Sequence, residues 1–372
     1  MRLHLFFPEN DLALARDLAH YTPPPAAVKL RRSGATLPMW YGDSGDRFVA
    51  EGVNAAWYRQ VERDFGTGIL PYNHQPAGLE AAPWGWSKAA RQRFIDLGFN
   101  SDSLPADASL DTLRALSHRR TAAKVAQILE DTLDFKVAPV AQEITEASAL
   151  KPLVEASPSG LVVKQPWSSS GRGLVATDAS IFDSQICNFQ GMIGRQGSVM
   201  AEVRHKGVLD FAMLFTLTEG KCRYDGLSLF HNTQLGSYAG NVLAPQAELE
   251  RRITSHCGQT QFDAIRTTLS TAIEAVAGDN YSGPLGVDMM IVDHPDYCIA
   301  PVVEINFRMT MGHLCRRFYE LHATDGAEGS FLISPASGAH RYAPVVENGR
   351  MSAGTLDLAA PGADFSFIIN LS

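Results

Sequence analysis

Two neighbouring segments with alternating side chains constrain the fold of this chain more than any other feature. Residues 286–293 read GVDMMIVD and residues 301–308 read PVVEINFR, with the turn-forming run His294-Pro-Asp between them. Because the side chains of a β-strand point alternately to opposite faces, each segment has one apolar face and one polar face. If the pair folds as a hairpin about position 296, Asp288 lies opposite Glu304, and Asn306 lies two residues further along. The sequence therefore predicts an antiparallel hairpin that brings three oxygen-bearing side chains together.

These three side chains form a candidate metal site. Two carboxylates that face each other across a hairpin repel, so the pair needs a compensating charge. Carboxylate oxygens are typical ligands of Mg²⁺, which often completes its shell with phosphate oxygens. We therefore predict that Asp288, Glu304 and Asn306 bind Mg²⁺, as one or two ions and with Mn²⁺ able to substitute. Two alternatives stay open: the acids simply face water, or a bulge at Pro301, which lacks an N–H group, shifts the register.

A Ser/Gly-rich loop provides a second chemical signal. The apolar run of residues 161–163 ends in Lys164, and the loop Ser168-Ser-Ser-Gly-Arg-Gly173 follows before a second apolar run begins at Leu174. Glycines allow backbone N–H groups to approach a phosphate closely. The loop lacks the GxxxxGK[ST] pattern and precedes a strand rather than a helix, so it is not a Walker loop. It is typical of a phosphate-covering flap between two antiparallel strands, although a plain hairpin tip beside a strand lysine remains an alternative.

Composition and charge exclude several other classes of protein. The 372 residues include 32 basic and 40 acidic side chains, for a net charge of −8, which disfavours binding to a nucleic-acid backbone. No stretch has the length and apolarity of a membrane span, and the polar residues after position 7 argue against a secretory signal. The five cysteines show no metal-binding spacing, so we expect reduced thiols in a cytoplasmic protein. The sequence leaves open whether the chain forms a homo-oligomer.

The order of predicted elements indicates an α/β chain with three parts. A short strand at residues 1–7, a polar turn and a helix at 12–20 open an N-terminal α/β domain, which we assign to residues 1–115. A Ser/Asp/Pro-rich segment at 102–111 is typical of a linker. We assign residues 116–204 to a small lobe that carries the flap and residues 205–372 to a large lobe that carries the metal site.

Taken together, these motifs resemble those of the ATP-grasp superfamily over roughly residues 115–320. The order is the same: an entry helix after the basic pair Arg119-Arg120, the strand that ends in Lys164, the flap, a strand that ends near Glu202, and then the two strands of the metal site. The resemblance implies two lobes with antiparallel sheets that grip ATP between them. Each motif is weak by itself, and the resemblance depends on their order and spacing.

The resemblance also implies a role for each residue of the candidate site. Lys164 and Arg119 (or Arg120) would bind phosphates, and the flap of Ser168, Ser169, Ser170, Gly171, Arg172 and Gly173 would close over them. Glu202 and Val203 would bind adenine, Asp210 the ribose, and Asp288, Glu304 and Asn306 the metal. Arg308 and Lys164 would stabilise charge during transfer, and Arg308, Asn241 and His313 would contact the substrate. Plainer interpretations stay open, namely solvated helix residues for Arg119 and Arg120, a surface acid at Glu202 and a turn residue at Asp210. Arg316 and Arg317 could line an anionic substrate pocket or cap a helix, and we favour the cap. Residues 8–11 follow the first strand, where open α/β sheets bind ligands, but we favour a turn with a helix cap.

The implied activity is that of a magnesium- and ATP-dependent ligase. Such an enzyme activates a small-molecule carboxylate as an acyl phosphate, which an amine or a similar nucleophile then attacks. ATP and an unidentified carboxylate are the expected partners, without nucleic acid or membrane. Two alternatives share the same ATP residues: a kinase that phosphorylates a hydroxyl, and a nucleotide-binding protein without catalytic activity.

Overall fold

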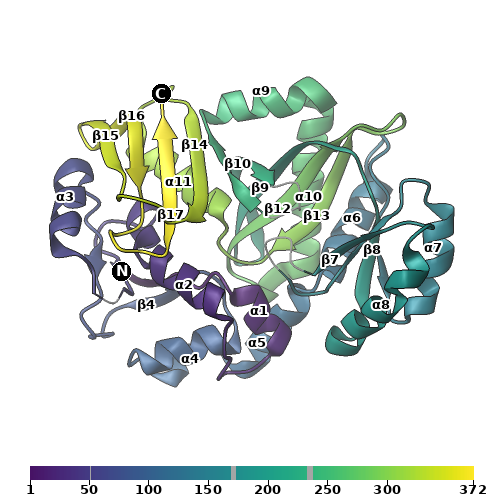
Figure 1. The fold of residues 1–372 in the computed structure, drawn as a ribbon, viewed down its shortest axis with the longest axis horizontal. Helices are drawn as coiled ribbons and strands as arrows, with labels where there is room; N and C mark the ends of the chain where they lie inside the picture. The colour runs from purple at the N-terminus through teal and green to yellow at the C-terminus, as the bar shows by residue number, and fades with distance from the viewer. Residues whose placement is uncertain (51, 169–172, 233–237) are drawn as a thin grey trace.

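The computed structural model describes residues 1–50, 52–168, 173–232 and 238–372, and it contains three β-sheets. The N-terminal sheet and the C-terminal strands lie at one end of the molecule, the small antiparallel sheet lies at the other end, and the long strands of the largest sheet lie between them (Figure 1). Mixed helix and sheet content with antiparallel sheets agrees with the predicted α/β class.

The N-terminal part is a parallel sheet with helices around it. Its strand order is β3-β2-β1-β4, and β1 pairs in parallel with both β2 and β4. The strands are β1 (Arg2–Leu5), β2 (Arg47–Phe48), β3 (Leu70–Pro71) and β4 (Glu80–Pro83). The helices are α1 (Asn10–Arg16), α2 (Pro25–Ser33), α3 (Ala55–Phe65), α4 (Lys88–Asp96) and α5 (Asp107–Leu116), with a 3-10 helix at Gly34–Trp40.

Two sequence-based expectations for this part differ from the structure. The opening strand and helix are present, but α1 ends at Arg16 because Asp17 adopts a left-handed conformation (φ 55°). The segment interpreted as a linker instead contains α5, whose Leu110 and Leu113 are buried. Leucines three residues apart form one face of a helix, and this short apolar face packs into the protein despite the polar residues around it.

The small lobe is an antiparallel sheet of order β5-β8-β6-β7, in which β6 pairs with β7 across the loop that carries the flap. Its strands are β5 (Gln142–Ile144), β6 (Leu161–Lys164), β7 (Leu174–Thr177) and β8 (Val199–Val203). Its helices are α7 (Leu150–Ala156) and α8 (Phe182–Gln196), whereas the preceding helix α6 (Arg120–Thr132) packs against β13 (Ile299–Asn306) and α10 (Gln259–Ala277) of the large lobe. The predicted flap residues 169–172 lie outside the described residues, but both strands that lead into the flap have the expected antiparallel pairing.

The largest sheet has nine strands in the order β13-β12-β9-β10-β11-β14-β17-β16-β15. The strands are β9 (Gly207–Thr218), β10 (Lys221–Asn232), β11 (Tyr238–Leu243), β12 (Gly283–Val292), β13 (Ile299–Asn306), β14 (Gly329–Pro335), β15 (Tyr342–Glu347), β16 (Arg350–Asp357) and β17 (Phe365–Leu371). The helices are α9 (Gln246–Cys257), α10 (Gln259–Ala277) and α11 (Met311–His322).

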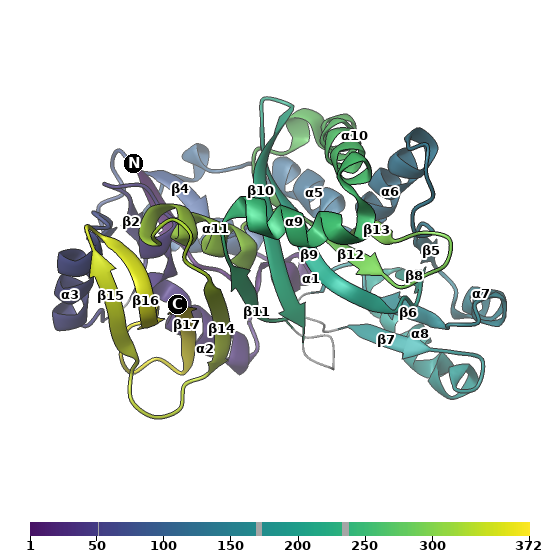
Figure 2. The ribbon, with the colours of Figure 1, turned by 90° about the horizontal axis from the view of Figure 1, so that it is seen from above.

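Helices cover one face of this sheet at β9 and β12, and α11 packs against β9, β10 and β11. Odd-numbered residues of β9 and β12, such as Phe211, Phe215 and Val287, are fully buried in one core with α6, α9 and α10. Helices α6 and α10 lie along the same side of these strands in Figure 2. Because alternate side chains face opposite ways, the even-numbered Asp210 and Asp288 lie on the other face.

The C-terminal strands share a core with the N-terminal domain. Phe331 and Phe367 of β14 and β17 belong to the same buried cluster as Leu3, Phe6 and Trp40. The nine-stranded sheet is thus continuous, but its last strands pack against the first residues of the chain. This packing holds the N-terminal domain beside the large sheet.

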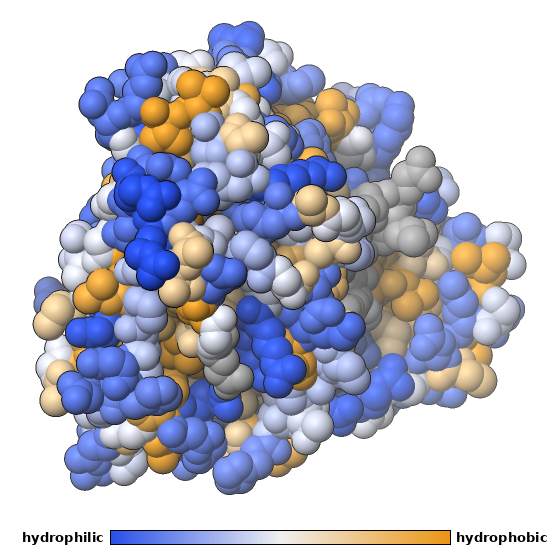
Figure 3. Space-filling model, turned by 60° about the vertical axis from the view of Figure 1, so that its left-hand side comes forward, coloured by the Kyte–Doolittle hydropathy of each residue, from blue (hydrophilic) through white to orange (hydrophobic). Residues whose placement is uncertain are grey.

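The remaining surface features are unremarkable for a globular chain. The face of the molecule in Figure 3 is mostly hydrophilic, with apolar residues in small separate groups. None of the helices formed by the described residues combines the length and apolarity that a membrane span requires. All five cysteines are free thiols.

Asp46 makes the N-terminal sheet sensitive to acid. Burial raises the pKa of Asp46, but hydrogen bonds from His4 and from the backbone N–H groups of Arg2 and Asp43 outweigh this effect and lower it to about 2. An acid whose pKa is lower in the folded state stabilises the fold above its unfolded pKa of about 4, and this stabilisation is lost as the pH falls towards 2.

We expect Asp46→Ala to lower the free energy of unfolding by about 2–3 kcal/mol at pH 7, because the buried His4 ring and two partly buried backbone N–H groups lose their acceptor. The stability difference between wild type and the variant should shrink between pH 4 and pH 2. Urea unfolding at several pH values measures both effects, and a difference that stays constant down to pH 2 would contradict the prediction.

Candidate functional site

The predicted carboxylate pair is present. Asp288 on β12 pairs directly with Glu304 on β13, and Asn306 pairs with Gly286 one step along the ladder. The Asn306 amide nitrogen donates a hydrogen bond to Asp288 Oδ2 (3.2 Å). The Oδ1 oxygen of Asn306 therefore remains a potential ligand. The hairpin is not regular, because the register shifts between Asp288 and Met290. The anticipated irregularity thus lies on the turn side of the pair and leaves the pair intact.

The electrostatics of this pair favour a cation. Burial, followed by repulsion from Glu304, raises the pKa of Asp288 to about 7. Glu304 has a positive neighbour, the Arg119 guanidinium, at 2.9 Å. Among the described residues, no three His, Cys, Asp or Glu side chains converge as a metal site. Two carboxylates and one amide oxygen suit a hard divalent cation such as Mg²⁺, whose remaining ligands would then come from phosphate or water.

Arg119 connects the metal strand to the base of the flap. It directly precedes α6, and its side chain is buried. Its Nε donates to the carbonyl oxygen of Gln165 (3.0 Å) and one of its terminal nitrogens donates to Ser168 Oγ (3.2 Å), while the same nitrogen approaches Glu304. The interpretation of Arg119 as a solvated helix residue is therefore wrong. Arg120 is half-exposed and pairs with Glu143 instead.

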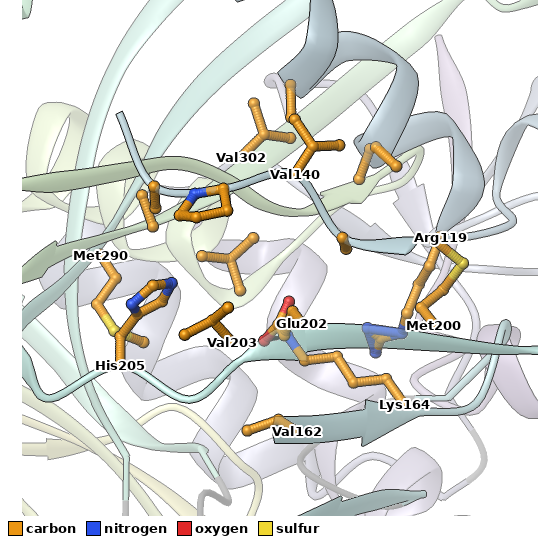
Figure 4. Close-up of a pocket in the computed structure, with 18 of the residues that line it drawn as sticks. Arg119, Val140, Val162, Lys164, Met200, Glu202, Val203, His205, Met290 and Val302 are labelled. Atoms are coloured by element: carbon orange, nitrogen blue, oxygen red, sulfur yellow. Dashed lines mark ion pairs between the residues drawn. The ribbon is translucent and has the colours of Figure 1, made fainter. Parts of the chain in front are cut away.

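A cavity of about 100 Å³ lies between the two lobes and contains the next predicted residues. Lys164 forms an ion pair with Glu202 on the neighbouring strand, and Arg119 points toward the same side of the cavity (Figure 4). The rest of the wall is mostly apolar and includes Val140, Val162, Met200, Val203, Met290 and Val302. An apolar slot with two cations at one end suits a flat ring that carries an anionic tail.

Other predicted residues are placed differently. Asp210 pairs with Met290 of the cavity wall but does not itself line the cavity, and it accepts a hydrogen bond from Asn232 (2.8 Å). Asn241 is buried, donates to Ser228 Oγ (2.6 Å) and is absent from the walls of both the cavity and the Arg308 region. The structure does not bring Asn241 to the expected phosphate position, because its polar atoms are used between β10 and β11.

The two remaining predictions concern the flap and His313. Gly173 closes the base of the flap, since its carbonyl oxygen accepts from the Gln165 N–H and its φ of +72° favours glycine. Ser169, Ser170, Gly171 and Arg172 lie outside the described residues. His313 forms a capping box with Thr310 at the start of α11 and lines a larger cleft beside Arg308. Burial lowers the pKa of His313 to about 4, so it is neutral near pH 7.

Arg308 has a partner that the sequence did not reveal. Asp11, which follows the first strand of the chain, binds the Arg308 guanidinium through both carboxylate oxygens at 2.6–3.2 Å across a separation of 297 residues. Both side chains are largely buried. The preferred interpretation of residues 8–11 as a turn with a helix cap is incomplete, because Asp11 pairs with Arg308 and Glu9 pairs with Arg31.

A small pocket surrounds this ion pair and joins it to the metal strand. Asn10, Asp11, Ser117, Trp167, Ser168, Glu304, Asn306 and Arg308 are among its lining residues. Asn10 is almost fully buried, and its Oδ1 atom has no hydrogen-bond partner. The place of Asn10 and Asp11 after the first strand, where open α/β sheets bind ligands, was a sequence signal for them, but it could not reveal Arg308, which comes from the other end of the chain.

Gly85 permits the close approach of the N-terminal domain to Arg308. A Cβ atom at this position would lie 2.6 Å from Asn10 Nδ2 and 2.9 Å from Arg308 Cβ. The adjacent backbone is also joined, since Met309 N–H donates to the Trp84 carbonyl oxygen (2.8 Å). There is thus no room for a side chain at this contact.

We expect Gly85→Ala to cost about 1–3 kcal/mol of stability and to displace the Arg308 side chain. Gly194→Ala is the matched control, because Gly194 lies within α8 and a Cβ there has no neighbour within 4 Å. Thermal unfolding measures the cost of each substitution. An equal or higher melting temperature for Gly85→Ala would contradict the predicted clash.

Comparisons with known proteins identify the fold. No protein-family model and no curated protein matches the sequence. Among solved structures, the match to the biotin carboxylase from Campylobacter jejuni covers 100% of this chain and 87% of the carboxylase chain, with 11% identity and a TM-score of 0.54. The biotin carboxylase domain of the Hydrogenobacter thermophilus 2-oxoglutarate carboxylase covers 100% and 86%, with 10% identity and a TM-score of 0.55. Both are ATP-grasp proteins, and this chain has the ATP-grasp fold.

Proposed function

We propose that this protein is an ATP-dependent ligase that activates a carboxylate as an acyl phosphate for attack by an amine or a similar nucleophile. The observation that carries the proposal is the continuous site formed by three elements: the Lys164–Glu202 pair on β6 and β8, Arg119 before α6, and the Asp288–Glu304–Asn306 group on β12 and β13. The two similar structures add support, since one is described as a complex with β,γ-ATP and the other as a complex with MgADP and bicarbonate.

The chemistry of the cavity supports an orientation for ATP. Adenine occupies the apolar slot beside Val203, and the triphosphate extends past Lys164 and Arg119 towards the carboxylate pair. Asp288, Glu304 and Asn306 hold Mg²⁺, which neutralises phosphate charge when it is bound. Glu202 keeps the Lys164 ammonium in place while the phosphate site is empty.

The transfer needs little covalent chemistry from the protein. A carboxylate oxygen of the substrate attacks the γ-phosphorus, the bond from that phosphorus to the β,γ-bridging oxygen breaks, and ADP leaves. The nucleophile then attacks the acyl carbon, phosphate leaves with the bonding electrons, and the nucleophile loses a proton. Arg308 orients the carboxylate, and Lys164 and Arg119 stabilise the charge on the transferred group.

Neutral hydroxylamine tests this proposal because it attacks acyl phosphates and forms stable hydroxamates. We expect carboxylate-dependent ADP release with MgATP, and hydroxamate formation when hydroxylamine replaces the natural nucleophile. The same assay with MnATP tests metal substitution. A phosphoester that resists hydroxylamine would identify a kinase, and ATP binding without ADP release for any carboxylate would identify a non-catalytic nucleotide-binding protein.

A further inference from the structure

A second and larger cleft opens beside Arg308, with a volume of about 930 Å³. The N-terminal sheet contributes one wall, α11 contributes another, and the adjoining ends of β9, β10 and β12 form the floor. The lining residues used below are Arg2, Asp43, Glu80, Arg316, Arg317 and Glu320. Sites for drug-sized molecules occupy roughly 300–1,000 Å³, so this cleft has room for a longer ligand than a free amino acid.

A chain of alternating charges runs along the cleft. Glu80 approaches Arg2 (3.9 Å), Arg2 approaches Asp43 (3.8 Å), and Asp43 pairs with Arg317 (3.0 Å). Glu320 then pairs with Arg317 (3.1 Å) and Arg316 (3.4 Å). Because positive and negative groups balance, the cleft suits a ligand that carries both signs of charge better than a polyanion.

The preferred interpretation of Arg316 and Arg317 as a helix cap is wrong. Arg350 performs this function, since it donates to the carbonyl oxygens of Ala323 and Glu320 at the end of α11. The side chains of Arg316 and Arg317 are directed to the cleft and its carboxylates instead. Their charges are therefore available to a ligand.

Strand β4 presents a free edge to the same cleft. Among the described strands, β4 pairs only with β1, and all four of its residues line the cleft. The Glu80 N–H donates to the Met1 carbonyl oxygen, and the Trp84 N–H donates to the Leu5 carbonyl oxygen. In a parallel pair, alternate residues direct their backbone groups toward the neighbouring strand. The N–H and C=O groups of Ala81 therefore point away from β1. The small side chain of Ala81 leaves these groups accessible. An extended peptide that joins a sheet edge uses main-chain groups of this kind.

We propose that this cleft binds the carboxylate substrate as an extended peptide, which hydrogen-bonds to the free edge of β4 and directs a carboxylate to Arg308. This inference rests on the proposed function and names its substrate class. Strand β4 leads to Trp84, whose carbonyl oxygen binds the Met309 N–H next to Arg308, so a ligand along β4 ends beside the metal strand. Peptides also carry charges of both signs, which the row of ion pairs from Glu80 to Arg316 complements.

The test compares a pool of random hexapeptides with a pool of free amino acids in the MgATP-dependent ADP-release assay. We expect the hexapeptides to give at least tenfold more ADP release at equal carboxylate concentration. Amidated hexapeptides separate the two sources of the carboxylate: loss of activity assigns the C-terminal carboxylate, and retained activity assigns an Asp or Glu side chain. Equal or greater release with free amino acids would overturn the inference, as would absence of release with the peptides.

Ala81→Pro tests the edge itself, because proline removes the N–H group that points away from β1. We expect this variant to lower kcat/KM for the hexapeptide pool about tenfold and to leave calorimetric MgATP binding unchanged. Ala81→Ser keeps the N–H group and should behave like wild type. If Ala81→Pro and Ala81→Ser give equal peptide-dependent rates, β4 does not bind the peptide. Loss of MgATP binding in the wild-type protein would instead reject the proposed function.

Discussion

Alanine at Lys164 or at Glu304 is expected to lower ATP turnover about a hundred- to a thousandfold without unfolding the protein. Lys164 is a buried cation of the cavity wall, and Glu202, its ion-pair partner among the described residues, lies in the same wall. Glu304 lies at 2.9 Å from Arg119 and faces Asp288, so its removal deletes a proposed metal ligand and a counter-ion together. ADP release measures turnover, and circular dichroism measures retention of the fold.

Two further variants separate chemistry from folding. Glu304→Gln retains an oxygen that can accept from Arg119 but loses the charge that binds a cation, so we expect a nearly normal melting temperature with strongly reduced Mg²⁺ dependence. Lys206→Ala removes an exposed lysine paired with Asp293 and should leave turnover unchanged. Wild-type turnover in both Lys164→Ala and Glu304→Ala would refute the site assignment.

Asp11→Asn is expected to lower kcat about 10- to 100-fold while the affinity for MgATP stays close to that of wild type. The carboxylate holds both the Nε and a terminal nitrogen of the Arg308 guanidinium, whereas asparagine offers one acceptor oxygen. Arg308 then retains its charge but loses its fixed orientation, which affects the transfer step more than nucleotide binding. Asp11 does not line the nucleotide cavity, so it acts through Arg308.

Asp17→Asn is the matched control for this prediction. Asp17 is a carboxylate of the N-terminal domain that pairs with Lys88 and not with Arg308. Its left-handed backbone conformation tolerates asparagine. Steady-state kinetics separate kcat from KM, and calorimetry gives MgATP affinity. A purely structural role for Asp11 predicts that its variant loses stability and keeps its kcat, which is the opposite of the expected result.

The parts of the site that the sequence predicted are those set by local rules. Residues 288, 304 and 306 share a face because side chains alternate along a strand, and a short hairpin brings such positions together. The order of motifs along residues 115–320 predicted the ATP-grasp fold, which the solved structures confirm. Lys164 and Glu202 line one cavity for a similar reason, since Lys164 lies opposite Met200 and Glu202 lies opposite Val162 on the antiparallel strands β6 and β8, which puts these side chains on one face.

Other positions depended on contacts that no local pattern encodes. Asn241 follows a glycine in a polar run and resembles a ligand-binding residue, but its neighbours on β10 and β11 use its amide group. Likewise, α5 forms where a linker was expected, because the Leu110 and Leu113 side chains are buried against the rest of the protein. Propensity is a weak guide wherever tertiary packing supplies the free energy.

The sequence by itself thus determined the fold class, the flap strands and the paired carboxylates, because each depends on side-chain alternation and on short chain connections. Only the tertiary structure decided that Asp11 holds Arg308 across 297 residues and that the C-terminal strands pack on the N-terminal core. The same long-range packing places β4 and α11 on opposite sides of one cleft. These contacts depend on how distant segments bury their apolar faces against each other, which is a property of the whole chain.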